Sequence, residues 1–314
     1  MPKAISQALA DAKLRLDDLD AIAYTRGPGM FGCLTVCTTA ARALAAASGK
    51  PIVGVHHMQA HALTALLTEE KPPEFPFFTL LVSGGHTQLV LAEDMSKYRI
   101  VMTTTDNAVG DVFDKVARLL HLPPSPTRGL GPVLEEYAAR PPLPPYDEAP
   151  LRLPLPLEGR NKDTLAFSFS GLLSATERLA KKESHGSEGV SEAVQRAVAR
   201  AFQTAAMRHL ADKVHLAIDT LGFPVRGLVV SGGVGSNKYL RESMKAMCDA
   251  IHSGAIPAYY PPIELCTDNA AMIAWTAILR LQDGLVCEPF DLPIRKKWSL
   301  EDLYDDVPAS SYRS

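Results

Sequence analysis

The sequence has few cysteines, and they form no pattern that is typical of a disulfide framework or a zinc knuckle. Five cysteines occur among 314 residues, which is an odd number, and no two of them form a Cys-x-x-Cys pair. Such usage is typical of a protein of a reducing compartment. Cys33 and Cys37 lie in an apolar stretch, which predicts that both pack in a core. The pattern excludes a small, disulfide-stabilised secreted fold.

The sequence also lacks a long apolar run, a strong excess of one charge and a leader-like N-terminus. The longest strongly apolar run, Phe75 to Val82, is far shorter than the roughly 20 residues of a membrane-spanning helix. It predicts a buried strand. The formal net charge is -3, so any contact with nucleic acid must be local. Residues 1–14 resemble neither a secretory signal nor an Arg-rich transit peptide, and their spacing predicts a helix.

Alternating apolar segments predict a layered α/β protein. Strands are predicted at 21–24, 52–55, 77–82, 88–92 and 228–230, and helices at 2–14, 34–47, 58–68, 111–121, 171–182, 190–221, 237–250 and 269–282. The chain is long enough for two lobes, which we expect at 1–105 and 106–285, with a polar tail at 286–314. Dense prolines predict an extended surface excursion at 122–160.

Two strands end in the same Ser-Gly-Gly turn, at Leu80–Gly85 and at Leu228–Gly233. Glycines at a strand end let the backbone approach a ligand and direct its N–H groups at phosphate. Because the turns fall in different predicted lobes, they indicate a nucleotide held between duplicated halves. His86 follows the first turn, where a contact with phosphate and a hydrogen bond to backbone are equally compatible with its position.

His57 and His61 are separated by one helical turn, directly after a predicted strand. Their Cβ atoms would lie roughly 5–6 Å apart, so both imidazoles could bind one cation. The end of a strand is where α/β proteins place ligands, although a chain with nine histidines also produces this spacing by chance. Asp268 is the candidate third ligand, and it could equally be the N-cap of the following helix.

Other polar residues have two interpretations each. Asp114 and Lys115 lie within a predicted helix, where a solvated face with an ion pair is the alternative to a binding role. Asn237 could bind a ligand or cap a helix. Phe167–Gly171 could be a buried strand edge followed by a cap.

Seven ordered motifs together resemble one family, the tRNA N6-adenosine threonylcarbamoyltransferases, in their bacterial and mitochondrial branch (once described as O-sialoglycoprotein endopeptidases, or glycoproteases). The motifs are Thr25–Gly29, His56–His61, Ser83–Thr87, Gly110–Lys115, Phe167–Gly171, Ser231–Asn237 and Pro261–Asn269. The resemblance extends over about residues 1–290.

The resemblance implies a two-lobed actin-like fold with duplicated halves (the ASKHA fold of sugar kinases and heat-shock ATPases) and a cleft between the lobes. It implies one divalent metal ion, whether Fe, Zn or Mg, held by His57, His61 and Asp268. It implies transfer of a threonylcarbamoyl group from threonylcarbamoyl-AMP to N6 of the adenosine 3′ of the anticodon in tRNA. The sequence names no general base for the attacking amine, and His86 is a candidate by its position alone. The residues implied in binding threonylcarbamoyl-AMP are Leu81, Val82, Ser83, Gly84, Gly85, Asp114, Gly131 and Asn237.

The chain departs from the family pattern at three places. A family Pro-Gly-Gly turn is replaced by Ser125–Gly131, in which Gly131 is the nearest equivalent. Gln59 and Ala60 stand where Glu and Gly are common. The first hairpin of the N-terminal lobe is missing ahead of Met1, which would leave a sheet edge open. We therefore expect a truncated chain that is less stable and weakly active or inactive. The alternative function is a remnant that binds only a partner or tRNA.

The sequence does not fit the requirements of two other enzyme classes. A zinc peptidase would need His-Glu-x-x-His, but Met58 follows His57. An actin-fold kinase or ATPase would need an acidic N-terminal phosphate loop, and we find none in the sequence.

We further expect tRNA as a partner, no membrane association, and a mitochondrial location (the cytoplasm for a bacterial chain). A mitochondrial chain is expected to form a homodimer, and a bacterial one to work with a companion subunit. Candidate tRNA contacts are Arg128, Arg140, Arg152, Arg160, Lys162, Arg178, Lys181 and Lys182.

Overall fold

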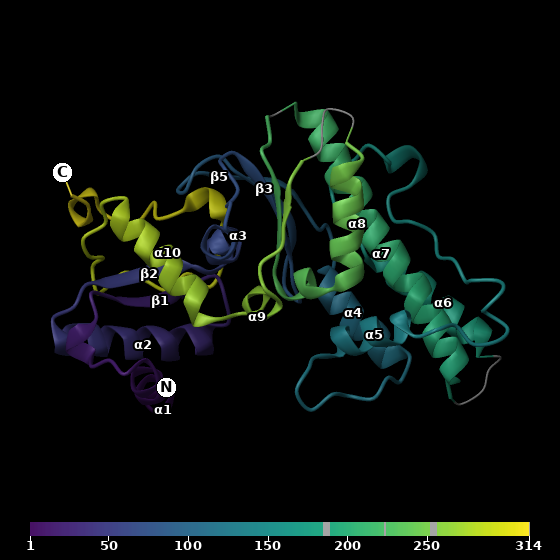
Figure 1. Cartoon of the computed structure of the whole chain (residues 1–314), viewed down its shortest axis with the longest axis horizontal. Coiled ribbons are helices and arrows are strands. Elements are labelled where there is room, and N and C mark those ends of the chain that lie inside the picture. Colours follow the sequence, from purple (N-terminus) through teal and green to yellow (C-terminus); the bar gives the residue numbers. More distant parts are fainter. Residues whose placement is uncertain (185–188, 223, 252–255, 314) are drawn as a thin grey trace. The chain divides into compact units, whose positions relative to one another are not determined.

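The computed structural model describes residues 1–184, 189–222, 224–251 and 256–313, and its contacts divide the chain into two compact units (Figure 1). Unit 1 comprises Met1–Thr68, Met95–Arg99 and Asp268–Ser314, and unit 2 comprises Glu69–Asp94 and Ile100–Thr267. Each unit is assembled from separate stretches of sequence, whereas the predicted boundaries divide the chain linearly. Those domain boundaries stay predictions.

Unit 1 is built on two parallel strands, β1 (Ile22–Gly27) and β2 (Ile52–His56). Helix α2 (Phe31–Ser48) covers one face of this sheet, and α3 (His57–Thr68) and α10 (Ala270–Gln282) cover the other (Figure 1). Successive side chains of a strand point to opposite faces of the sheet, so unit 1 has a hydrophobic core on each face. Ile52 packs with the α2 side chains, while Val53 and Val55 pack with those of α10. Helix α1 (Pro2–Ala12) precedes the sheet and buries none of its residues.

Helix α2 is the one helix in the described residues that is long and apolar enough to cross a membrane by length and composition alone. Its buried residues recur every three or four positions, at Leu34, Thr38, Ala41 and Ala45. That spacing forms one stripe along the helix. The stripe is the side of α2 that packs on the sheet of unit 1.

Unit 2 contains a mixed sheet with the strand order β5-β4-β3-β6-β7. The strands are β3 (Phe77–Val82), β4 (Thr87–Ala92), β5 (Tyr98–Thr103), β6 (Leu228–Ser231) and β7 (Ala258–Tyr259). Strand β3 pairs antiparallel with β4 and parallel with β6. Every residue of β3 is buried, which explains its continuous apolar run. Strands β5 and β7 lie at the edges of the sheet and were not expected from the sequence.

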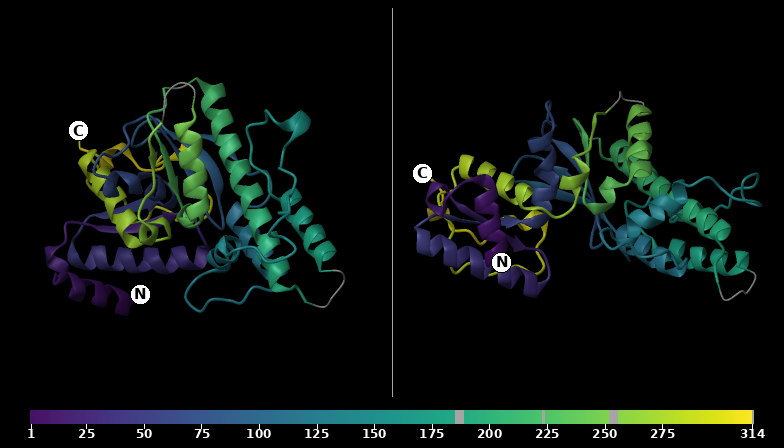
Figure 2. Two further views of the ribbon diagram at one scale, coloured as in Figure 1. Left: turned by 45° about the vertical axis from the view of Figure 1, so that its right-hand side comes forward. Right: turned by 60° about the horizontal axis from the view of Figure 1, so that its bottom comes forward.

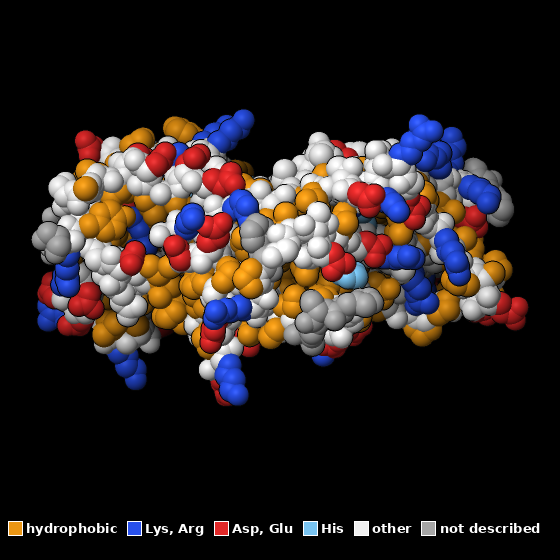
Figure 3. Space-filling view, turned by 90° about the horizontal axis from the view of Figure 1, so that it is seen from above, with side chains coloured by type: hydrophobic (Ala, Val, Ile, Leu, Met, Phe, Trp, Pro, Cys, Tyr) orange, Lys and Arg blue, Asp and Glu red, His pale blue; other side chains and the backbone are white. Residues whose placement is uncertain are grey.

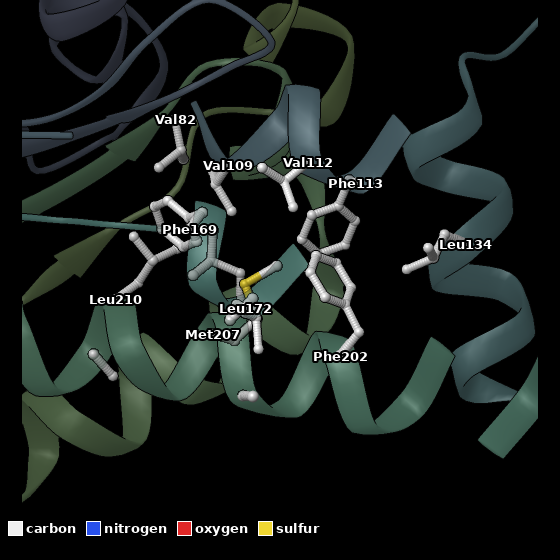
Figure 4. Packing of buried hydrophobic residues seen from close by; sticks show 14 of the residues in the cluster. Val82, Val109, Val112, Phe113, Leu134, Phe169, Leu172, Phe202, Met207 and Leu210 are labelled. Atoms are coloured by element: carbon white, nitrogen blue, oxygen red, sulfur yellow. The ribbon is translucent and has the colours of Figure 1, made fainter. Parts of the chain in front are cut away.

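Helices pack on this sheet and on one another around the largest core of the protein (Figure 2). They are α4 (Val109–Leu119), α5 (Leu130–Ala139), α6 (Ser170–Glu183), α7 (Glu192–Leu221), α8 (Lys238–Asp249) and α9 (Ile263–Cys266). Helix α7 contacts α5, α6 and α8 along its length. Figure 4 shows the core beside it, where the rings of Phe113 and Phe202 meet edge to face with centroids 4.9 Å apart.

The proline-rich excursion is partly helical, so the prediction of an extended segment over 122–160 is wrong for residues 130–139. Helix α5 buries Val133, Leu134 and Ala138 at helical spacing. The prolines concealed this pattern, although Pro132 lies in the first turn, where a missing N–H costs no helical hydrogen bond. Residues 140–158 contain neither a helix nor a strand.

Residues 286–313, where the sequence predicts a polar tail, contribute buried side chains to unit 1. Leu292, Trp298 and Leu300 are each less than a tenth exposed. The segment contains only two short 3-10 turns, at Leu300–Asp302 and Ala309–Ser311. Its apolar residues are too widely spaced to form a periodic pattern.

Candidate metal and nucleotide sites

Unit 1 brings together the three predicted metal ligands. Strand β2 ends at His56 and α3 begins at His57, so His57 and His61 project from consecutive turns, with ring centroids 4.8 Å apart. Asp268 Oδ1 lies 3.2 Å from Nε2 of His57 and 3.2 Å from Nε2 of His61. Within the described residues, this is the one cluster of three or more His, Cys, Asp or Glu side chains with the geometry to hold a metal ion.

The protonation states of these side chains suit a divalent cation. Burial lowers the pKa of His61, and the nearby carboxylate offsets this only in part, so the imidazole is neutral at pH 7. Hydrogen bonds from His57 and His61 hold the pKa of Asp268 well below its usual range. Two imidazoles and one carboxylate are a donor set that binds divalent metals and leaves coordination positions for a substrate.

Asp268 is not the N-cap of the helix that follows it, so that alternative is wrong. Asn269 is the cap, because its Oδ1 accepts a hydrogen bond from the Met272 N–H at 2.8 Å. The Asp268 side chain is 80% exposed and turns toward the two histidines.

In unit 2, the two Ser-Gly-Gly turns lie side by side at the ends of neighbouring parallel strands. Leu81 of β3 is in register with Ser231 of β6. Gly232 has φ +95°, and a Cβ atom there would lie 2.4 Å from the Val82 carbonyl oxygen. Only glycine fits such an approach. The two turns therefore belong to one sheet, and the expectation that they lie in separate lobes is wrong.

The first turn is held by its own serine and by the start of α4. Ser83 Oγ accepts hydrogen bonds from the N–H groups of Gly85 and His86 at 3.3 and 3.0 Å. The Gly110 N–H donates to the Ser83 carbonyl at 3.2 Å. The His86 backbone thus helps to shape the turn, while a role for its side chain, and substrate binding by residues 81–85, stay predictions.

Asp114 and Gly131 come together although they belong to different helices. Asp114 Oδ1 accepts a hydrogen bond from the Gly131 N–H at 3.1 Å. Asp114 therefore fastens the first turn of α5, and the ion pair on this face of α4 is formed instead by Lys115 and Asp111, at 2.7 Å.

Asn237 is the N-cap of α8, as expected, and two polar residues that the sequence did not predict bind this helix start, Gln203 through Asn237 and Glu135 through Lys238. Asn237 Oδ1 accepts from the Leu240 N–H at 2.9 Å, and its Nδ2 donates to Gln203 Oε1 at 3.0 Å. Glu135 accepts from the Lys238 N–H at 2.8 Å, and burial raises the pKa of Glu135. Neither could be selected, because Gln203 interrupts no pattern in its helix and Glu135 lies on the helix that the prolines concealed.

Phe167 and Phe169 are fully buried, and α6 begins directly after them at Ser170. Asp106 accepts hydrogen bonds from Ser168 Oγ at 2.6 Å and from the Phe169 N–H at 2.8 Å. This motif therefore forms a buried edge and a helix start.

The candidate tRNA contacts differ in their environment. Arg128 and Arg140 form ion pairs with Glu136. Arg128 is nevertheless exposed, and Lys182 also pairs with Glu183, at 3.8 Å. The remaining candidates are all exposed, and they are Arg152, Arg160, Lys162, Arg178, Lys181 and Lys182. Lys and Arg side chains gather at the right-hand end of the face shown in Figure 3, where α6 and α7 lie in Figure 1.

Comparisons with solved structures support the fold. The chain is similar to HypF of T. kodakarensis, with a TM-score of 0.60 and 16% identity over 90% of this chain and 43% of that chain. It is also similar to full-length HypF in the phosphate- and nucleotide-bound form, with a TM-score of 0.52 and 13% identity over 74% of this chain and 36% of that one. The chain thus spans less than half the length of either protein, and these likenesses concern the α/β fold alone.

Comparisons with sequences identify the family. The profile of TsaD, tRNA N6-adenosine threonylcarbamoyltransferase, matches residues 1–275. The chain is 42% identical to the tRNA N6-adenosine threonylcarbamoyltransferase of Sinorhizobium medicae, over 95% of this chain and 78% of that protein. It is 40% identical to the protein of the same name in Albidiferax ferrireducens, over 95% of this chain and 81% of that protein. This chain belongs to the TsaD family.

Proposed function

We propose that this protein transfers the threonylcarbamoyl group of threonylcarbamoyl-AMP to N6 of the adenosine 3′ of the anticodon in tRNA. The observation that carries the proposal is the assembly of His57, His61 and Asp268 into one cluster in a chain of the TsaD family. The relatives at about 40% identity are named for this transfer.

The chemistry requires binding and orientation more than a protein nucleophile. Threonylcarbamoyl-AMP is a mixed anhydride and is already activated. The N6 amine attacks the carbonyl carbon, the bond from that carbon to the phosphate oxygen breaks, AMP leaves, and a base accepts the proton from N6. We propose that the Gly84 N–H, in a turn whose Ser83 and Gly85 N–H groups donate within the turn, donates a hydrogen bond to the substrate's negative charge, and that Asp114, Gly131 and Asn237 complete the nucleotide site. His86 is the candidate for the base.

His57, His61 and Asp268 would hold a divalent cation, which supplies Lewis-acid stabilisation of the leaving phosphate when it is bound. Fe, Zn and Mg all remain candidates. The donor set favours a metal that accepts nitrogen ligands, because two of the three ligand atoms are imidazole nitrogens.

The cluster argues against a peptidase. Such an enzyme needs a carboxylate beside the first histidine as the general base. The residues between the two ligands are Met58, Gln59 and Ala60, and the amide of Gln59 is engaged by Tyr304 Oη and the Met95 carbonyl oxygen.

We extend the proposal to the partners and the location. The exposed basic residues between Arg152 and Lys182 would contact the tRNA backbone, since phosphate attracts Lys and Arg without reading sequence. The protein would act as a homodimer in the mitochondrion, or with a companion subunit in the cytoplasm of a bacterium.

The test is a transfer assay with the purified chain, threonylcarbamoyl-AMP and a tRNA that carries the target adenosine. Modified nucleoside is measured by mass spectrometry after digestion of the tRNA, with and without a metal chelator. We expect metal-dependent formation of threonylcarbamoyladenosine. Binding of tRNA without binding of metal or nucleotide, and without modified nucleoside, would favour the alternative of a remnant that only binds.

A further inference from the structure

The first turn of the metal-binding helix is capped by a histidine that is not a ligand. His56 is fully buried at the end of β2. Its Nδ1 accepts hydrogen bonds from the N–H groups of Met58 and Gln59, at 3.2 and 3.3 Å. A ring nitrogen that accepts carries no proton, so the proton of the neutral ring lies on Nε2. Nε2 is 3.2 Å from the carbonyl oxygen of Trp298. Trp298 lies in the C-terminal segment, residues 286–312. Its carbonyl oxygen thus selects the His56 tautomer that caps α3.

A second contact from the same segment reaches the residue between the two ligands. The Tyr304 hydroxyl donates to Gln59 Oε1 at 2.5 Å and accepts from the His56 N–H at 3.3 Å. Gln59 Nε2 donates to the Met95 carbonyl at 2.9 Å. The side chain of Gln59 is therefore fixed at both ends, and with it the turn of α3 from which His57 projects.

The C-terminal segment is itself held within unit 1 by buried contacts. The guanidinium of Arg280 lies 3.3 Å from the centre of the Tyr304 ring. Arg280 also pairs with Glu288 at 2.6 Å, with side chains only 5% and 1% exposed. Glu288 Oε2 in turn accepts the Gly54 N–H of β2 at 2.7 Å. Trp298 packs edge to face on Tyr304, with ring centroids 5.5 Å apart. These contacts leave Tyr304 little freedom to follow a movement of α3.

We infer that the C-terminal segment, residues 286–312, positions the metal ligands, and that Tyr304 is the positioning residue. The inference rests on the metal site of the proposed function, and the segment lies outside residues 1–275 that match the family profile. His57 lies in the first turn of α3, the turn that these contacts hold. His61 lies in the next turn, where its side chain is only 3% exposed and is held by burial. Releasing the first turn would therefore move His57 away from the point at which the three ligand atoms converge. Partners of this kind, outside the ligands themselves, typically change metal affinity about 10- to 100-fold.

The test compares two substitutions, each of which removes one tyrosine hydroxyl group. Tyr304→Phe deletes both hydrogen bonds to the start of α3 and keeps the ring beneath Arg280. The matched control is Tyr312→Phe, which deletes a hydroxyl that accepts a hydrogen bond from Arg280 of α10 at 3.4 Å. Co²⁺ is titrated into each metal-free full-length protein, and the dissociation constant and the visible d–d absorption are recorded. We expect Tyr304→Phe to bind Co²⁺ about 10-fold more weakly with an altered spectrum, and Tyr312→Phe to stay within about twofold of the wild type.

Thermal unfolding of the metal-free proteins separates positioning from general stabilisation. The inference is overturned if Tyr304→Phe lowers the melting temperature but keeps the wild-type affinity and spectrum; the proposed function would then stand. A wild-type protein that binds no Co²⁺ overturns both the inference and the metal site. If Tyr304→Phe does not fold, Gln59→Met breaks the same link from the α3 side, and the same weakening and spectral change are expected.

Discussion

Asp268 and Asn269 are adjacent in the chain, yet their side chains bind different elements. Asn269 Oδ1 accepts the Met272 N–H and caps α10, while Asp268 Oδ1 faces Nε2 of His57 and of His61 at 3.2 Å. The cap, one residue after the carboxylate, fixes the start of α10 at Ala270. The geometry thus separates a stabilising residue from a ligand at neighbouring positions.

The first prediction uses this separation. Asp268→Asn removes the negative ligand, so we expect metal affinity and transfer to fall by about 100-fold or more, with little loss of folding stability. Asn269→Ala removes the cap and should cost about 1 kcal/mol of folding free energy, with metal affinity unchanged. Isothermal titration with metal and urea unfolding measure the two quantities. Equal effects of both substitutions on metal affinity would contradict the assignment.

The second prediction concerns the close approach of Gly232, in the second Ser-Gly-Gly turn, to Val82, which precedes the first turn. Gly232→Ala places a Cβ atom 2.4 Å from the Val82 carbonyl oxygen in a backbone with φ +95°. We expect a loss of about 3 kcal/mol or more in urea unfolding, because both the backbone conformation and the contact are unfavourable. Gly233→Ala is the control, since a Cβ atom there meets nothing within 4 Å. A Gly232→Ala protein as stable as the Gly233→Ala protein would show that the turns are looser than described.

The third prediction concerns acid stability. Burial, reinforced by the nearby Lys213 and opposed by Asp106, lowers the pKa of His209 to about 4 from 6.5. The unfolded chain therefore binds this proton at higher pH than the folded chain. Its contribution to stability is complete above pH 6.5 and is lost as the pH falls toward 4, by about 3 kcal/mol in all.

His209→Gln should remove that part of the pH dependence, because glutamine can still accept the Ser168 N–H that His209 Nε2 accepts at 3.3 Å. His215→Gln is the control, since its side chain is 36% exposed. Urea unfolding between pH 4 and 7 gives the comparison. If the free energy of unfolding of His209→Gln falls with decreasing pH as steeply as that of the wild type, other groups cause the loss of stability in acid.

The fourth prediction concerns the buried ion pair of unit 1. Arg280→Met leaves the Glu288 carboxylate buried without its cation, which should cost about 3–5 kcal/mol. Adding Glu288→Gln removes the stranded charge and keeps an acceptor for the Gly54 N–H. We therefore expect the double variant to be more stable than Arg280→Met alone in urea unfolding. Simple addition of the two single costs would show that the residues are not coupled.

The sequence predicted the elements whose patterns are local. The apolar run of β3 and the period of α7 were sufficient, and the i, i+4 spacing of His57 and His61 placed both on one side of α3. The metal cluster could be predicted because the family motifs identified Asp268. Capping chemistry alone could not choose between Asp268 and Asn269, since both residue types cap helices well.

What the sequence could not supply was pairing between distant segments. The two Ser-Gly-Gly turns look alike wherever they lie, and only the parallel pairing of β3 with β6 places them in one sheet. Helix α5 was hidden by prolines that its first turn tolerates. The role of Tyr304 had no local signal, because its partners Gln59 and His56 lie 245 and 248 positions away in the chain.

The discontinuity of unit 1 has a consequence for biosynthesis. Residues 69–267 contain all of unit 2, interrupted only by residues 95–99 of unit 1, and they can fold while translation continues. Residues 1–68 are made earlier but must wait for Asp268, Glu288 and Tyr304. The histidines therefore leave the ribosome long before their carboxylate partner and the contacts that fix them. A metal ion that needs all three ligands would therefore bind only after Asp268 has been made, when residues 69–267 can already have folded.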